Sequence, residues 1–325
     1  MKNLLQTKYA GLNLKNPIIV GSSGLTNSFD KIKELEKAGA AAVVLNSLFE
    51  EQVSMQTNWL LESEAYPEAN DYISQYVKNH EVVDYLELIQ QVKTACRIPV
   101  IASINCYQSG AWTEFARQIE MAGADAIELN IFVLYAEINA NSDTLENEYI
   151  RILRKVKEVV NIPVTVKIGK QFSSIPNMVN KLYANGAAGV VLFNRFYQPD
   201  IDINKLQFVS GQVFSSHSDI IDTLRWTAIV SGRIPQTSLA ASTGIHDWED
   251  VIKCLLAGAS AVELCSAIYQ CGNELIGQIC RSLEEWMISM HFKSIESFVG
   301  KLSCANIDTS LYERIQFMKY FSNRD

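Results

Sequence analysis

The sequence Pro163-Val164-Thr165-Val166-Lys167-Ile168 is followed, 23 residues after its proline, by Gly186-Ala187 and then by the apolar run Gly189-Val190-Val191-Leu192. Proline is tolerated at the first residue of a strand, and glycine just past a helix can adopt the left-handed conformation that ends it. Two short apolar strands with room for a helix between them predict one β-α-β unit.

The same spacing occurs four times in the chain. Pro17, Pro99 and Pro235 begin three further units, and a Gly-Ala pair follows each after 22 to 24 residues. The eight predicted strands are 18–20, 41–45, 100–102, 126–129, 164–166, 189–192, 238–241 and 261–264. Their nearly continuous hydrophobicity is typical of parallel strands buried on both faces. We therefore predict an α/β TIM (β/α)8 barrel, and favour it over a doubly wound open sheet because no strand is followed by GxGxxG.

The length of 325 residues, 48% of them hydrophobic, fits one barrel domain over residues 1–325 with insertions after its second and sixth strands. The first insertion, Glu50 to His80, is rich in carboxylates and aromatics and could be a lid, a surface decoration or a dimer contact. In the second, Phe208 to Phe214 is expected to form two short strands around a Ser-Gly turn. A C-terminal helical extension from Trp286 to Tyr320 could pack on the barrel or on a second copy, as a homodimer.

Composition argues against several classes of partner. The net charge is −8 and the pI is about 5.2, without a run of Lys and Arg, so nucleic acid is not an expected partner. No stretch approaches the ~20 apolar residues of a membrane span, which favours a cytoplasmic protein. Seven cysteines without CxxC spacing predict reduced thiols, and no His, Asp or Glu triplet at the strand ends suggests a metal site.

Chemistry in such a barrel is carried by side chains at the C-terminal strand ends. Four of the eight predicted strands end in asparagine, which offers donors and acceptors to a planar heterocycle, although a single asparagine could equally cap a helix. Small, hydroxylated residues after the seventh and eighth strands suggest a phosphate site. The strand-end residues are Ser22, Ser23, Asn46, Ser47, Asn105, Asn130, Lys167, Asn194, Arg195, Ser242, Thr243, Gly244, Cys265 and Ser266.

Lys167 follows an apolar strand, and three roles are open to it. It could form a buried structural ion pair. It could be the Schiff-base nucleophile of a lyase that acts on a phosphorylated substrate. It could also be a fixed positive charge beside an anionic reduced flavin.

Several motifs extend this pattern to nearly the whole chain: Asn16-Pro17-Ile18-Ile19, Glu128-Leu129-Asn130, Val166-Lys167 and the segment 294–302. On these motifs the chain resembles the FMN-dependent dihydroorotate dehydrogenase family. The segments 47–52 and 192–202 are similar to the branch called dihydroorotate dehydrogenase-like. The resemblance implies a flavoprotein oxidoreductase of pyrimidine biosynthesis, in which a small substrate gives hydride to flavin N5 and a Cys or Ser base removes a proton.

The resemblance also implies roles for the strand-end residues. Lys167 would stabilise the reduced flavin, and Asn130, Asn194 and Arg195 would bind the substrate. The residues implied to hold FMN are Ser22, Ser23, Asn46, Asn105, Asn130, Lys167, Asn194, Ser242, Thr243, Gly244, Cys265 and Ser266.

Three positions depart from the family pattern. Val133 stands where the family has its base, Asn46 where it has a lysine, and Thr243 and Cys265 replace glycines near the phosphate. Tyr135 or Glu137 could serve as a substitute base. The alternatives to an oxidoreductase are therefore a degenerate, non-catalytic family member and a lyase dependent on Lys167.

Overall fold

The computed structural model describes residues 4–49, 82–105, 112–131, 138–139, 141–196 and 198–308. The predicted first insertion lies outside the described residues, as do Val133, Tyr135 and Glu137. The C-terminal extension is described as far as Asp308.

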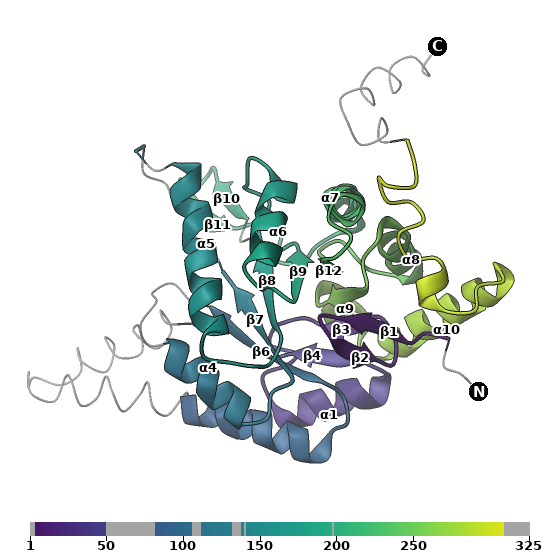
Figure 1. The fold of residues 1–325 in the computed structure, drawn as a ribbon, viewed down its shortest axis with the longest axis horizontal. Helices are drawn as coiled ribbons and strands as arrows, with labels where there is room; N and C mark the ends of the chain where they lie inside the picture. The colour runs from purple at the N-terminus through teal and green to yellow at the C-terminus, as the bar shows by residue number, and fades with distance from the viewer. Residues whose placement is uncertain are drawn as a thin grey trace, which may run out of the picture.

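Eight parallel strands form a closed barrel (Figure 1). In chain order they are β3 (Ile18–Val20), β4 (Ala42–Val44), β6 (Val100–Asn105), β7 (Ala126–Asn130), β8 (Val164–Ile168), β9 (Gly189–Leu192), β12 (Ser238–Ser242) and β13 (Ala261–Leu264). Each pairs with the next, β4 pairs with β6, and β13 returns to β3. The short β5 (Leu48–Phe49) adds to β6 beyond the end of β4. The predicted barrel and its eight strands are confirmed.

Helices surround the barrel (Figure 1). They are α1 (Phe29–Ala38), residues 82–95, α4 (Trp112–Met121), α5 (Ser142–Lys157), α6 (Ile175–Ala184), α7 (Ile220–Arg233), α8 (Trp248–Ala257), α9 (Ser266–Cys271) and α10 (Glu274–Ser289). Gly39 and Gly258, at φ of 112° and 116°, end α1 and α8. Both lie in the left-handed region that side chains disfavour, so the repeated Gly-Ala pair does mark helix ends.

Side chains of the barrel strands alternate between two environments. In β8, Val164, Val166 and Ile168 belong to the large apolar cluster shared with the surrounding helices, whereas Thr165 and Lys167 take the alternate positions that face the interior. A hairpin of β1 (Thr7–Tyr9) and β2 (Leu12–Leu14) covers the N-terminal strand ends, where the backbone N–H of Ala10 donates to the Ser238 hydroxyl. This hairpin closes one end of the barrel and leaves the C-terminal strand ends for the site.

The insertion after β9 is an antiparallel hairpin of β10 (Pro199–Asp202) and β11 (Gln207–Ser210). The predicted turn at Ser210-Gly211 is wrong, because Phe208 pairs with Ile201 and the chain reverses at residues 203–206. Asp202 fixes this earlier turn, since its carboxylate accepts hydrogen bonds from the backbone of Asn204 and Lys205. Asp202 at the start of the turn therefore indicates the position of the turn better than Ser210-Gly211 does.

The described part of the C-terminal extension packs on its own barrel. Met287, Ile295 and Phe298 are fully buried, and the rings of Trp286 and Phe298 lie 5.2 Å apart. Backbone N–H groups of Gly300 and Leu302 donate to carbonyls at the end of α8. The sequence left open whether these apolar residues pack on the barrel or on a second copy. In the structure they pack on the barrel.

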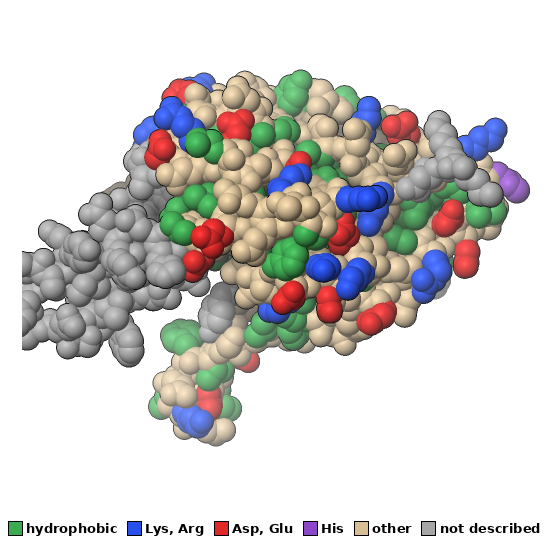
Figure 2. Space-filling model, turned by 90° about the horizontal axis from the view of Figure 1, so that it is seen from below, with side chains coloured by type: hydrophobic (Ala, Val, Ile, Leu, Met, Phe, Trp, Pro, Cys, Tyr) green, Lys and Arg blue, Asp and Glu red, His purple; other side chains and the backbone are tan. Residues whose placement is uncertain are grey.

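Among the helices in the described ranges, none has the length and apolar character needed to cross a bilayer. The six cysteines outside the undescribed segments are all free thiols. On the face in Figure 2, positive and negative side chains are interspersed, so this face presents no continuous basic surface.

Candidate functional site

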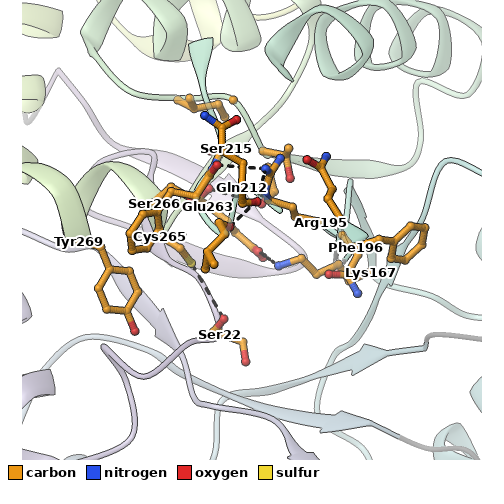
Figure 3. Close-up of a pocket in the computed structure, with 18 of the residues that line it drawn as sticks. Ser22, Lys167, Arg195, Phe196, Gln212, Ser215, Glu263, Cys265, Ser266 and Tyr269 are labelled. Carbon is orange, nitrogen blue, oxygen red and sulfur yellow. Dashed lines mark hydrogen bonds and ion pairs between the residues drawn. The ribbon is translucent and has the colours of Figure 1, made fainter. Parts of the chain in front are cut away.

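A cavity of about 300 Å³ lies at the C-terminal ends of β3, β8, β9, β12 and β13 (Figure 3). Its volume is at the low end of the range for small-molecule sites. Its lining brings together the predicted strand-end residues Ser22, Lys167, Asn194, Arg195, Ser242, Thr243, Gly244, Cys265 and Ser266. The rest of the lining is Phe196, Gln198, Ser210, residues 212–215, Ile245, Glu263 and Tyr269. Most of the site predicted from the sequence therefore lies around one cavity.

Asparagine and serine side chains form a chain of hydrogen bonds beside this cavity. The Asn194 amide donates to Asn130 Oδ1 at 2.6 Å, and the Asn130 amide donates to Ser47 Oγ at 3.2 Å. Ser47 Oγ is also within 3.1 Å of Ser22 Oγ and 2.7 Å of Ser103 Oγ. These bonds fix the amide orientations, so polar groups from β3, β6, β7 and β9 are held in place together.

Five of the predicted strand-end residues are not part of the cavity lining. Two of them, Ser47 and Asn130, belong to the chain of hydrogen bonds beside it, and the other three lie apart. Ser23 shapes the turn before α1, because its hydroxyl donates to the Gly21 carbonyl and accepts from the Leu25 N–H. Asn46 lines a second cavity of about 460 Å³ near Thr26 and the helix at residues 82–95. Asn105 is buried at the end of β6, next to an undescribed segment. Their predicted contacts with a cofactor stay predictions.

The turn after β12 has a left-handed backbone at both Thr243 and Gly244, with φ of 79° and 83°. A Cβ on Gly244 would lie 2.1 Å from the backbone nitrogen of Ile220, so only glycine fits there. The Thr243 hydroxyl donates to the carbonyl of Phe193, which holds its side chain toward β9. Thr223 donates to the carbonyls of Ser242 and Thr243 and fixes the turn from α7.

Arg195 contacts the loop that forms the rim of the cavity. Its guanidinium donates to Asp219 Oδ2 at 3.1 Å and to the carbonyls of Gln212, Val213 and Phe214. Burial opposes the charge of Asp219, but the hydrogen bond from the Ser216 backbone and the positive charge of Arg195 outweigh it and lower the pKa of Asp219. In the described contacts Arg195 stabilises this loop, and substrate binding by Arg195 stays a prediction.

Lys167 is the positive charge in the floor of the cavity, and it points to Glu263 (Figure 3). Its Nζ lies 2.6 Å from Glu263 Oε2 and 3.7 Å from Glu128 Oε1, and only 7% of the residue is exposed. Burial opposes the ammonium, but the charge of Glu263 and then that of Glu128 outweigh it and raise the pKa of Lys167. A buried ion pair, one of the three roles open to Lys167, is therefore present.

Glu128 and Glu263 were missed by the prediction of site residues. Glu128 lies two residues before the predicted site residue Asn130, and Glu263 two residues before Cys265. Both side chains point into the barrel interior, and both residues are buried. A period-two reading of these strands would have found them, because each is a carboxylate between two outward apolar residues.

Another cluster that the sequence did not indicate joins η1 (His217–Asp219) to the start of α8. A ring nitrogen of His217 and carboxylate oxygens of Asp247 and Asp250 lie within 4.8 Å of one another. Asp250 accepts from His217 Nδ1 at 2.8 Å, from the His246 backbone at 3.1 Å and from Lys253 at 2.9 Å. Burial and then the neighbouring His217 lower the pKa of His246. These contacts connect two elements of the scaffold beside the site.

Comparisons with known proteins show which family the sequence matches. The family model described as dihydroorotate dehydrogenase matches residues 4–287. The chain is 28% identical over 311 residues to "Dihydroorotate dehydrogenase B (NAD(+)), catalytic subunit" of Thermoplasma volcanium, covering 91% of this chain and 97% of that protein. It is 26% identical over 304 residues to the protein of the same name from Methanosarcina acetivorans, covering 89% and 93%. It is also 26% identical over 313 residues to the protein of the same name from Methanocaldococcus jannaschii, covering 91% of this chain and 97% of that protein.

Proposed function

Because this chain belongs to the dihydroorotate dehydrogenase family, flavin-dependent oxidoreductases that act on CH-CH groups in pyrimidine biosynthesis, we propose that it is an FMN-dependent oxidoreductase. The proposed reaction is hydride transfer between a small planar or carboxylated substrate and flavin N5. The observation that carries the proposal is a buried lysine at the end of β8, in the floor of a polar cavity at the C-terminal face of the barrel.

The residues around the cavity fit FMN in their chemistry. An ammonium, hydroxyls and amides come from five strand ends, which suits a ring with mixed donors and acceptors. Gly21 leaves room for the lining residue Cys265, because a Cβ at position 21 would lie 2.9 Å from Cys265 Sγ. The hydroxyls of Ser242 and Ser266, with the backbone at Gly244, are our proposed phosphate contacts.

When bound, FMN supplies the hydride acceptor at N5. Lys167 would supply positive charge at the ring edge, where charge develops during reduction. The hydrogen-bonded pair Asn130 and Asn194 would orient the substrate, because their amides are already fixed. Tyr135 is our proposed proton acceptor, since Val133 has no group that can take a proton.

A lyase with Lys167 as nucleophile has less support. A Schiff base forms from the neutral amine, and the raised pKa of Lys167 keeps it as an ammonium near neutral pH. A non-catalytic family member is favoured by one observation, the apolar Val133 at the base position.

We also propose a homodimer. The hairpin of β10 and β11 exposes Leu206 and Phe208, at 86% and 78%, next to exposed Ile201 and Ile203. An apolar patch of this kind often marks an interface. Light scattering of the wild type and of Phe208→Glu would test it, with a monomeric variant as the expected result.

The test of the proposed function is the visible spectrum of the purified protein before and after incubation with FMN and removal of the excess. Bound flavin in the wild type and in the exposed control Lys205→Met, with much less in Lys167→Met, would support the proposal. Anaerobic mixing of the flavin-loaded protein with dihydroorotate then follows bleaching of the flavin band. Bleaching identifies an oxidoreductase; bound flavin without bleaching by any dihydropyrimidine supports the non-catalytic alternative, and no bound flavin contradicts the proposal.

A further inference from the structure

The interior of the barrel holds two carboxylates and one ammonium at the floor of the cavity, where Lys167 and Glu263 are part of the lining. Glu128 and Glu263 project from β7 and β13, which are separated by β8, β9 and β12 around the barrel. Within the described part of the chain, Lys167 is the only positive group that forms an ion pair with either of them. Fully ionised, this cluster would carry one net negative charge in a closed space.

The oxygens of these carboxylates are incompletely paired. Among the described residues, Glu263 Oε2 has the 2.6 Å bond to Lys167, while Glu263 Oε1 and both oxygens of Glu128 have no hydrogen-bond partner. An ionised carboxylate without a partner is costly to bury, whereas a protonated one carries no charge and leaves Lys167 to pair with the other carboxylate. Two carboxylates that share a buried site do not both ionise readily.

Three other titratable groups lie near Glu128 and Glu263, and none of the three can supply a positive charge to balance the second carboxylate. Tyr9 reaches the cluster from the β1–β2 hairpin, Tyr85 from the helix at residues 82–95, and Cys265 from the end of β13. Burial raises the pKa of each, to about 11 for Cys265, so all three are neutral near pH 7. Burial and then the charge of Glu263 also raise the pKa of Glu128, which makes it the group that holds a proton.

We propose that Glu128 and Glu263 share one proton, held mainly on Glu128, so that the cluster is neutral and Lys167 can compensate negative charge that enters the cavity. Glu128 is then a positioning residue, which acts on the cavity through Lys167. An ionised Glu128 would compete for the ammonium and add negative charge below the site. The shared proton follows from the cluster alone, whereas its effect on an anion in the cavity rests on the proposed function.

Infrared difference spectroscopy at neutral pH, on protein without added ligand, tests the shared proton. The wild type is expected to show the carbonyl band of a buried carboxylic acid that shifts in D2O. Both Glu128→Gln and Glu263→Gln are expected to lose it, because in either variant the remaining carboxylate pairs with Lys167 and ionises. Glu146→Gln is the matched control, since Glu146 is also buried but has its own lysine, Lys181, at 2.7 Å. Absence of the band in the wild type, or its survival in both variants, would overturn the proposal.

A second measurement tests the effect on the cavity. In the flavin-loaded protein, Glu128→Gln is expected to leave the midpoint potential of the flavin unchanged at neutral pH, because a neutral group replaces a neutral group. A rise of the potential in Glu128→Gln would mean that Glu128 is ionised and would contradict the proposal. Failure to bind flavin would overturn the proposed function alone, because the infrared band still decides the shared proton.

Discussion

The two ends of the barrel interior differ in chemistry although the same strands build both. At the N-terminal end, inward side chains such as Ile101, Ala126 and Ala261 belong to an apolar cluster with Tyr9 and Leu14 of the β1–β2 hairpin. At the C-terminal end the inward positions carry Ser103, Glu128, Lys167 and Glu263. The interior therefore combines a packed apolar layer with a buried charged layer.

The change from one layer to the other takes two residues along a strand. Ala126 belongs to the apolar cluster and Glu128 to the charged one, and Ala261 and Glu263 repeat this step in β13. Burying charge costs free energy, which the apolar layer and the outer helices offset. In return the charged groups are held rigid beneath the cavity, as electrostatic stabilisation of a reaction requires.

The largest expected effect comes from removing the cation of the charged layer. Lys167→Met leaves the ionised carboxylate of the buried Glu128–Glu263 pair without a positive partner, so the free energy of unfolding should fall by about 4 kcal/mol. Urea denaturation at pH 7 measures this change. The double variant Lys167→Met with Glu263→Gln should recover part of the loss, and a single variant as stable as the wild type would contradict the ion pair.

The apolar layer should show a somewhat smaller effect. Leu14 is fully buried in the hairpin that closes the barrel, so Leu14→Ala should lower the free energy of unfolding by about 3 kcal/mol through lost burial and a cavity. Leu206→Ala, at an exposed position of the second hairpin, is the control and should change it little. Flavin binding by Leu14→Ala at low temperature should be retained if the two layers act separately.

The comparison also explains what the sequence could predict. The eight strands were predictable because each is apolar on both faces near its start, and Pro and Gly mark where strands begin and helices end. The strand ends Lys167, Asn194 and Ser242 follow directly from that register. Glu128 and Glu263 were read as part of apolar runs, because a single carboxylate within a strand does not reveal its partners across a barrel. Arg195 was assigned to substrate because its contacts with residues 212–214 depend on a loop whose path the sequence does not specify.

The third prediction concerns how the stability of the charged layer depends on pH. The pKa of Glu128 is raised in the folded protein, so the wild type loses stability relative to Glu128→Gln as pH rises above the ordinary glutamate value. Between about pH 5 and about pH 6 the difference should grow by about 1.4 kcal/mol, and it should not change below the ordinary pKa of glutamate. Thermal or urea unfolding from about pH 4 to about pH 6 measures it. A difference independent of pH would mean that Glu128 has its ordinary pKa.

The smallest effect is expected at the boundary between the layers. Tyr9 is fully buried, and within the described residues its hydroxyl has no hydrogen-bond partner. Its ring belongs to the apolar cluster, while burial and then the charge of Glu263 raise the pKa of its hydroxyl. Tyr9→Phe keeps the ring and removes the unpaired group, so the free energy of unfolding should rise by about 1 kcal/mol. A loss of stability in Tyr9→Phe would instead mean that the hydroxyl is bonded, through water or otherwise, to the carboxylates above it, and the charged layer would then extend down to the hairpin.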